Sequence, residues 1–422
     1  MLHPSTGAIE NRMPCKICQS MESNLYSDET LVINCMRHLK KLFDWLLILK
    51  KGYHQDAPTV PKKTIYRLAA ARSLTYLVTF RMIFCLSIDD VHLKYLLGYP
   101  YKENAEGVLL SILMSLTYIL FSLLRELVYY FESNGKMAVT VELNYLLALT
   151  PGQLHSLSRL KVFIRYMKYF LPNWIALFYF FLCMTPIFSI QIRLINPDIW
   201  TNHVYIISSI IWMIPEALTI VYVVGGLIIF FGHALMFLMI YYSRLCYLLH
   251  QFGRLVEMEC STTQANELLI KLNYSFIKFL NDITKQAYDV RYVWLYMLLL
   301  ACGLNNTCLY CGTIKQIKPI ILAFSLTIYG VCEFVISAIA IHKAGEIIEK
   351  IYAIHNHYIK LSLKLKTRLD TRLKVLEILQ RIMSPRTCPT IGDFFEIKKS
   401  VVMTFIMENI CLILLITVNA NR

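Results

Sequence analysis

The chain has 422 residues, of which 57% are hydrophobic and only 17% are charged, and its mean hydropathy is +0.51. Soluble domains average about 45–50% apolar and about 25% charged residues, so this composition argues against disorder, a coiled coil and an ordinary soluble enzyme. The net charge of +14 comes largely from basic residues between apolar stretches, where membrane proteins carry topology signals and not nucleic-acid sites. The composition therefore predicts one all-α, polytopic membrane domain.

Seven apolar stretches are long enough to cross a bilayer, which takes about 20 predominantly apolar residues. In chain order they are Leu68–Ile88, Val108–Phe131, Phe163–Ile190, Tyr205–Leu249, Tyr292–Thr313, Pro319–Ile341 and Val401–Val418. The fourth stretch is too long for one crossing, and Pro215 and the Gly225-Gly226 pair can break or kink it. This predicts a short outer segment over Tyr205–Ile214 and a long helix over about Ala217–Tyr247.

Three further stretches have helical character without spanning length. Leu42–Leu49 is apolar, too short to cross and flanked by lysine pairs, which predicts an amphipathic or interfacial helix. Gln251–Val290 and Ala344–Ile382 repeat their apolar residues at the spacing of an amphipathic helix, about 3.6 residues. They predict that the fourth, fifth and sixth spans continue beyond the membrane and pack there as an anchor bundle.

The basic residues predict the orientation of the chain. Of the 42 Lys and Arg residues, 34 lie in segments 1–72, 133–168, 244–291 and 343–399, and only 6 lie in the alternating segments. Because basic residues concentrate on the cytosolic side, we expect the N-terminus in the cytosol. With seven spans, the C-terminus is then extracellular.

Signatures of catalysis are absent from the sequence. It has no Gly-rich phosphate loop and no His-Glu-x-x-His pair, and the Cys15-x-x-Cys18 pair lacks a second ligand pair at zinc spacing. We therefore expect no enzymatic activity, cofactor or metal. Two other membrane classes are less favoured: a G-protein-coupled receptor would place its N-terminus outside, and a transporter would show internal repeats in two halves.

Ionisable residues within the spans are costly and mark either interhelical pairs or functional sites. They are Arg81, Arg125, Glu126, Glu216, His233, Glu333 and Glu408. For Arg125 and Glu126, near a span end, pairing is favoured. Glu216 lies near Trp212 and Tyr222, and an acid among aromatic residues suits a polar or cationic ligand, with interhelical pairing as the alternative.

The C-terminal third carries a resemblance to a known family. Span six is followed by Ala344-Gly345-Glu346-Ile347-Ile348, and span seven is preceded by Thr390-Ile391-Gly392-Asp393-Phe394-Phe395-Glu396-Ile397. Within span seven, the hydrophobic run Leu412–Ile416 stands between Ile410-Cys411 and Thr417-Val418. This layout is similar to that of insect gustatory receptors, whose last helix has Thr-Tyr, five hydrophobic residues and Gln-Phe. The hydrophobic five match, and the four flanking residues differ.

The resemblance implies a ligand-gated, non-selective cation channel in the plasma membrane of chemosensory neurons. It would be a homo- or heterotetramer whose seventh helices line one central pore. Its partners would be a small-molecule tastant, membrane lipid, other receptor subunits and the permeating cations. The departure from the usual final-helix motif favours a bitter or other non-sugar tastant.

The expected organisation has four parts. Residues 1–67 form a cytosolic segment with an interfacial helix, and residues 68–343 form transmembrane helices one to six with the pocket and cytosolic loops. Residues 344–396 form the cytosolic anchor region, and residues 397–422 form the pore-lining seventh helix and a short outer C-terminus.

The resemblance also places the sites. The pocket is expected to open to the outside among spans two, three, four and six. Its candidate residues are Ser115, Tyr118, Phe180, Met184, Trp212, Glu216, Tyr222, Ser325 and Tyr329. On the last helix one face carries Met403, Met407, Ile410, Leu414 and Thr417. The resemblance puts a hydrophobic gate at Leu414 and a polar ring at Thr417, while a competing stripe of Ser400, Thr404 and Glu408 would supply an acidic ring.

Overall fold

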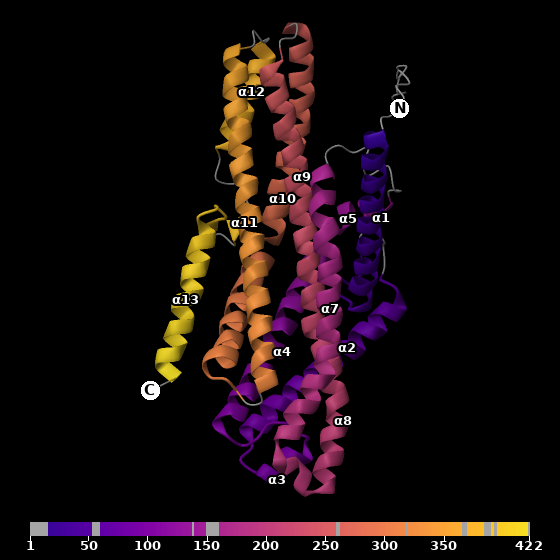
Figure 1. Ribbon diagram of the computed structural model, residues 1–422, viewed down its shortest axis with the longest axis vertical. Coiled ribbons are helices and arrows are strands. Elements are labelled where there is room, and N and C mark those ends of the chain that lie inside the picture. The colour runs from indigo at the N-terminus through magenta and orange to yellow at the C-terminus, as the bar shows by residue number, and fades with distance from the viewer. Residues whose placement is uncertain are drawn as a thin grey trace.

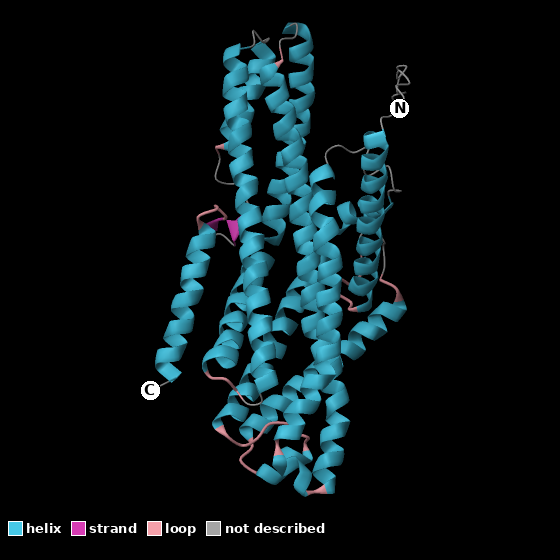
Figure 2. Cartoon of the chain, viewed as in Figure 1, coloured by secondary structure: helices cyan, strands magenta, loops and turns pink. Residues whose placement is uncertain are grey.

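Long helices running nearly side by side make up the computed structural model, as Figures 1 and 2 show. It describes residues 16–52, 60–136, 139–148, 160–258, 262–317, 320–364, 369–383, 390–391 and 395–420. Seven helices in this part of the chain are long and apolar enough to cross a membrane. Only β1 (Thr390–Ile391) and β2 (Phe395–Glu396), which pair antiparallel, are strands among the described residues. The prediction of an all-α protein with seven membrane helices is confirmed.

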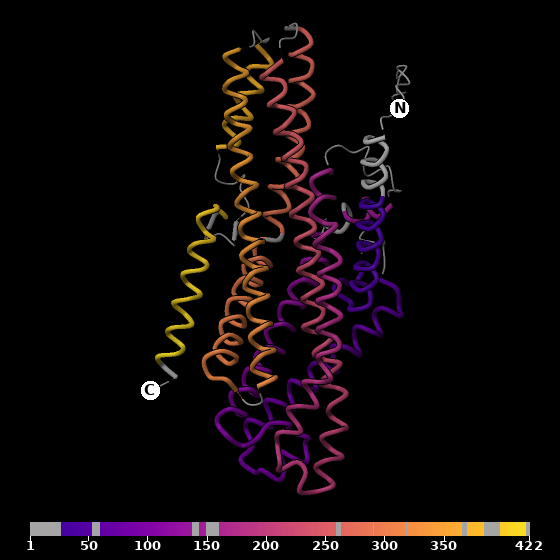
Figure 3. The backbone as a smooth tube through the Cα atoms, viewed as in Figure 1, coloured from indigo at the N-terminus to yellow at the C-terminus, as the bar shows by residue number. Residues whose placement is uncertain are grey.

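Figure 3 traces the chain through these helices. The first half contains α1 (Lys16–Trp45), α2 (Lys62–Ser87), α3 (Val91–Leu96), α4 (Ala105–Ser133), α5 (Val139–Ala148), α7 (Lys161–Ile195) and the 3₁₀-helix η2 (Pro197–Thr201). The second half contains α8 (His203–Ile220), the π-helical turn η3 (Val221–Gly225), α9 (Gly226–Glu257), α10 (Thr262–Leu309), the π-helical turn η4 (Tyr310–Ile314), α11 (Ile320–Lys364), α12 (Leu369–Ile382) and α13 (Val401–Ala420).

The fourth span is not broken at Pro215, so the predicted division into two helices is wrong. α8, η3 and α9 form one continuous helix over His203–Glu257, 55 residues long. Pro215 lies inside α8, and membrane helices tolerate a proline where neighbouring groups satisfy the carbonyl that it frees. The Gly225-Gly226 pair lies where η3 meets α9, and a π-helical turn takes up an extra residue without ending the helix.

The segment Leu42–Leu49 does not form a helix of its own, unlike the amphipathic or interfacial helix that was predicted. Its first residues end α1, which packs on α7 and α9, and Leu46–Leu49 form a buried turn. The turn is buried because Arg125 of α4 donates to the Leu46 and Leu47 carbonyls, so these polar groups have partners. Beside it, Arg72 donates to Glu126 at 2.6 Å. The pairing interpretation of Arg125 and Glu126 therefore agrees with their contacts.

At the end of the molecule opposite α3, α9, α10 and α11 continue and pack with α12, and we call this part the distal bundle (Figure 1). Its core is aromatic, since the rings of Phe252, Phe276 and Tyr358 lie 4.7–6.0 Å apart. Tyr358 also donates to Asn273 at 2.8 Å. Spans four, five and six thus continue as helices, as predicted. The stretch Gln251–Val290 divides between α9 and α10.

The expected boundary between residues 343 and 344 falls inside α11. Ala344–Ile382 divides between α11, which runs unbroken to Lys364, and α12, and residues 365–368 lie outside the described part of the chain. The membrane part and the distal bundle therefore share continuous helices.

α13 lies along one edge of the molecule and packs on α10, α11 and η4 (Figure 1). Its packed side includes Phe405, whose ring lies 5.6 Å from that of Phe334 on α11. The segment just before α13 approaches α11 at Gly345, where an added Cβ would lie 2.8 Å from the backbone nitrogen of Lys399. Only a residue without a side chain permits this approach, because backbone cannot give way as a flexible side chain does.

We expect Gly345→Ala to lower the stability of the purified chain by about 1–3 kcal/mol, the usual cost of overpacking. The control is Gly303→Ala on the exposed side of α10, where an added Cβ meets nothing within 4 Å. Alanine there should be neutral or stabilise by about 1 kcal/mol, because it favours helix more than glycine. Thermal unfolding in detergent measures both variants, and equal effects would contradict the close approach.

Candidate functional site

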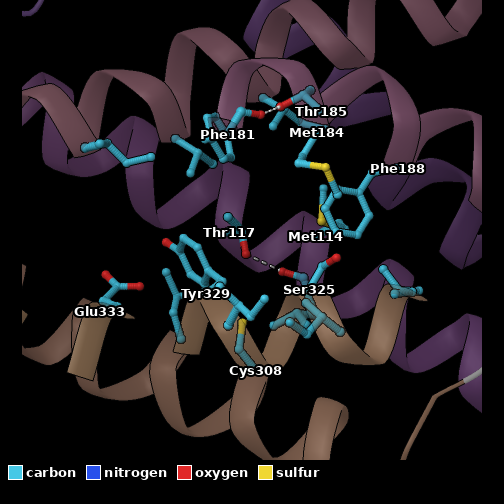
Figure 4. Close-up of a pocket in the computed structure, with 18 of the residues that line it drawn as sticks. Met114, Thr117, Phe181, Met184, Thr185, Phe188, Cys308, Ser325, Tyr329 and Glu333 are labelled. Atoms are coloured by element: carbon cyan, nitrogen blue, oxygen red, sulfur yellow. Dashed lines mark hydrogen bonds between the residues drawn. The ribbon is translucent and has the colours of Figure 1, made fainter. Parts of the chain in front are cut away.

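A cavity of about 520 Å³ lies between α4, α7, the α8–α9 helix, α10 and α11. This volume is in the range of small-molecule sites, which is about 300–1,000 Å³. Among the residues that line it in Figure 4 are Met114, Thr117, Phe181, Met184, Thr185, Phe188, Cys308, Ser325, Tyr329 and Glu333. Apolar and aromatic walls with a few polar groups are the surroundings in which small molecules bind.

Six of the nine pocket residues proposed from the sequence line this cavity. They are Tyr118, Phe180, Met184, Glu216, Ser325 and Tyr329. The cavity also lies among spans two, three, four and six, with α10 of span five as an additional wall.

The other three proposed pocket residues lie elsewhere. Ser115 follows Met114 on α4 and is therefore turned about 100° around the helix from that lining residue. Trp212 lies under the guanidinium of Arg81, 4.5 Å from it, and Tyr222 lies 3.4 Å from the guanidinium of Arg125. Both aromatic rings thus hold cationic side chains of the protein itself.

Several lining residues were not singled out as pocket residues from the sequence. Thr117, Trp174, Phe181 and Phe188 gave no signal, because a chain with 22 Phe and 27 Tyr offers aromatic residues in nearly every span. Glu333 gave the general signal of a costly acid within a span, but its place in the cavity depends on how α11 is rotated.

Glu216 lies in the cavity lining between two arginines from other helices. Its carboxylate accepts from Arg193 of α7 at 2.6 Å and from Arg81 of α2. Arg193 also donates to Ser209 at 2.9 Å, and Arg81 donates to the carbonyl of Leu97 at 2.7 Å. Two cations around one anion leave this cluster net positive. Glu216 is therefore paired between helices and offers no free negative charge to a cationic ligand.

Buried side chains hold the segment before α4, whose Tyr101 lines the cavity near the Glu216 cluster. Tyr95 donates to Asp198 at 3.0 Å, and the side chain of Asn196 donates to the carbonyl of Tyr101, a lining residue, at 2.8 Å. Burial raises the pKa of Tyr95 to about 12, so its hydroxyl keeps its proton and remains a donor at physiological pH. These bonds join the segment after α7 to the segment before α4.

The side of α10 and α11 that faces α13 is mainly apolar and contains one buried amide pair. Asn306 of α10 donates to Asn409 of α13 at 2.8 Å, and both side chains are buried. Asn409 in turn donates to the carbonyl of Phe405 at 2.6 Å. A buried amide pair therefore joins α13 to a helix that also lines the cavity.

The residues proposed for a pore lie mostly on the side of α13 that the rest of the chain leaves uncovered. Met407, Ile410 and Leu414 are exposed, and Thr417 is half-buried at the edge of the packed side, donating to the carbonyl of Ile413 at 2.8 Å. The competing stripe of Ser400, Thr404 and Glu408 is exposed too. Both stripes thus share one uncovered face.

No protein-family model and no curated protein sequence matches the chain. Its structure is similar to that of the insect olfactory receptor OR5 from Machilis hrabei, with a TM-score of 0.61 and 12% sequence identity over 91% of this chain and 98% of that chain. The same receptor in complex with eugenol gives a TM-score of 0.62 and 12% identity, over 92% and 98% of the two chains. The chain therefore has the same fold as this insect olfactory receptor.

We expect Glu216→Gln to destabilise the chain by about 3–5 kcal/mol, because the variant leaves two buried guanidinium groups without their counter-ion. The control is Glu377→Gln in the distal bundle, which removes an exposed pair with Lys374 and should cost less than about 1 kcal/mol. Thermal unfolding and surface expression measure both. A Glu216→Gln variant as stable as the control would mean that the cluster is not a structural link.

Proposed function

We propose that this chain is a subunit of a tastant-gated, non-selective cation channel in the plasma membrane of chemosensory neurons. The observation that carries the proposal is the apolar cavity of about 520 Å³ within the fold of an insect olfactory receptor. A small molecule in the cavity is the stimulus, and α13 lines the conduit that it opens.

The lining of the cavity supports a small, mostly apolar stimulus. A receptor of this fold has been solved in complex with eugenol, so the fold can hold a small molecule. A sugar would need hydrogen-bond partners for many hydroxyl groups, and unpartnered hydroxyls in an apolar site are costly. Because the lining offers few polar groups, we propose a bitter or other non-sugar tastant.

The uncovered face of α13 supports a pore between several copies of the chain. It carries the apolar residues Met407 and Leu414 beside the exposed acid Glu408. An acid facing lipid within a membrane helix is expensive, so this face suits a water-filled conduit or other subunits. In a tetramer the four α13 helices would meet on one axis, with Leu414 as the narrow gate and Thr417 as the polar ring beside it.

The helices between the cavity and α13 support coupling of the two. α10 and α11 line the cavity on one side and pack against α13 on the other, through the Asn306–Asn409 bond and the Phe334–Phe405 contact. A ligand that binds the open arrangement of α10 and α11 more tightly than the closed one would shift α13 with them.

The arrangement of basic residues supports the orientation that a taste receptor needs. The helices of the distal bundle and their loops carry most of the Lys and Arg residues after α9, which supports a cytosolic position for this bundle. The end of the cavity that Tyr101 lines would then face outside, where a tastant arrives.

Cysteine cross-linking tests the pore without a known ligand. In a Cys411→Ser background, we expect Leu414→Cys to form disulfide-linked dimers on oxidation. A central gate would bring residue 414 of neighbouring subunits close together, and a disulfide forms when the Cα atoms lie within roughly 7 Å. The control is Ile413→Cys, half-buried on the packed side, which should remain monomeric on a non-reducing gel. Dimers of Glu408→Cys alone would favour the competing stripe, and monomers throughout, with a monomeric particle, would favour a transporter.

Filling the cavity tests the ligand site. We expect Ser325→Phe to raise the half-maximal concentration of every active tastant by about tenfold or more, because the added ring obstructs the site. A tenfold change corresponds to a loss of about 1.4 kcal/mol of binding free energy. The control is Ser275→Phe on the exposed side of α10, whose hydroxyl, like that of Ser325, bonds the carbonyl four residues earlier. Whole-cell cation currents over a tastant panel measure both, and an unchanged Ser325→Phe response would place the ligand elsewhere.

A further inference from the structure

Glu333 of α11 is an acid of the cavity lining that has no counter-ion among the described residues. It is 9% exposed, and its Oε2 atom has no hydrogen-bond partner in the described part of the chain. Its surroundings are Tyr329, one turn earlier on α11, and Cys308 of α10. Neither of these side chains can neutralise a carboxylate.

The two acids of the lining therefore differ in what they offer a ligand. Glu216 is enclosed by Arg81 and Arg193, so its end of the cavity is net positive. Glu333 has the uncharged side chains of Tyr329 and Cys308 as its neighbours, and neither arginine of the Glu216 cluster is among them. A cationic group is repelled at one end of the cavity and attracted at the other.

Burial makes the missing counter-ion at Glu333 consequential. Ionising an acid without a partner in an apolar, membrane-embedded site is costly, and a bound cation would relieve that cost. An ammonium group supplies the positive charge and up to three donors, while the aromatic walls, including the ring of Tyr329, favour a nearby cation. A neutral alcohol supplies one donor and no charge.

We propose that the cavity selects apolar amines and that Glu333 is the residue that pairs with the ammonium group. This inference rests on the proposed function, in which the cavity is the ligand site. The amine binds with its nitrogen toward α11 and its hydrocarbon part against the aromatic residues of α4 and α7. The Arg81–Glu216–Arg193 cluster excludes the reverse orientation.

Two probes of equal shape test the proposal: adamantylmethylamine and adamantylmethanol, which differ only in the amine or hydroxyl group. The full chain is purified in lipid nanodiscs, and the binding of each probe is measured by calorimetry and by ligand-induced thermal stabilisation. In the wild type the amine should bind at least about tenfold more tightly than the alcohol, because hydrogen bonds to charged groups contribute about 1.5–3 kcal/mol.

Three variants locate the effect. Glu333→Gln should remove the preference for the amine and leave the affinity for the alcohol within about threefold, because the amide keeps the shape and loses the charge. Glu377→Gln, the exposed acid of the distal bundle, should leave both affinities unchanged. Ser325→Phe should weaken both probes.

The outcomes separate this inference from the proposed function. If Ser325→Phe weakens the alcohol but the wild type binds both probes equally, or if Glu333→Gln keeps the preference, the role of Glu333 is overturned and the ligand site stands. If neither probe binds, or Ser325→Phe weakens neither, the cavity is not the ligand site and both proposals fail. If Glu333→Gln does not fold, two other results test the role of Glu333. The wild type should prefer the amine, and Glu333→Asp, which keeps the charge, should keep that preference.

Discussion

At the end of the molecule that contains α3, the arrangement of the helices depends on one interaction, a carboxylate held between two guanidinium groups. Glu216, Arg81 and Arg193 come from three different helices, and each alone would be a costly charge in an apolar environment. They pair with one another, and Arg81 also donates to the carbonyl of Leu97, so these contacts join α2, α7 and α8. Arg193 and Glu216 line the cavity, and the net positive charge of the cluster makes that end of the cavity positive.

The other end of the cavity has a different character because α10 and α11 have neighbours on both sides. Toward the cavity they present Tyr329 and Glu333, and toward α13 they present Asn306 and Phe334. A membrane-embedded amide pair has no water to replace a lost partner, so the Asn306–Asn409 bond joins α13 firmly to the cavity wall. A ligand that prefers one arrangement of α10 and α11 can affect α13 only if the side of these helices that faces the cavity and the side that faces α13 move together.

Sequence patterns were most successful where bilayer thickness was the constraint. The seven apolar stretches matched seven helices, because the need for about 20 apolar residues per crossing leaves a strong one-dimensional signal. They failed where neighbouring helices changed a local rule. Pro215 should end a helix in water, yet it lies inside α8, and Leu42–Leu49 looks interfacial but is covered by other helices, with Arg125 satisfying two of its carbonyls.

Hydropathy and spacing specify the class of molecule: seven apolar helices, their extension into a bundle and a cost attached to every acid within a span. The use of those acids depends on the packing of the helices. In the sequence, Glu216 and Glu333 are both acids within apolar stretches. In the structure, Glu216 lies between two arginines, whereas Glu333 faces the cavity without a counter-ion among the described residues. The reason is rotation: hydropathy depends on composition along a helix, whereas a partner depends on which way each helix faces and which helix stands opposite.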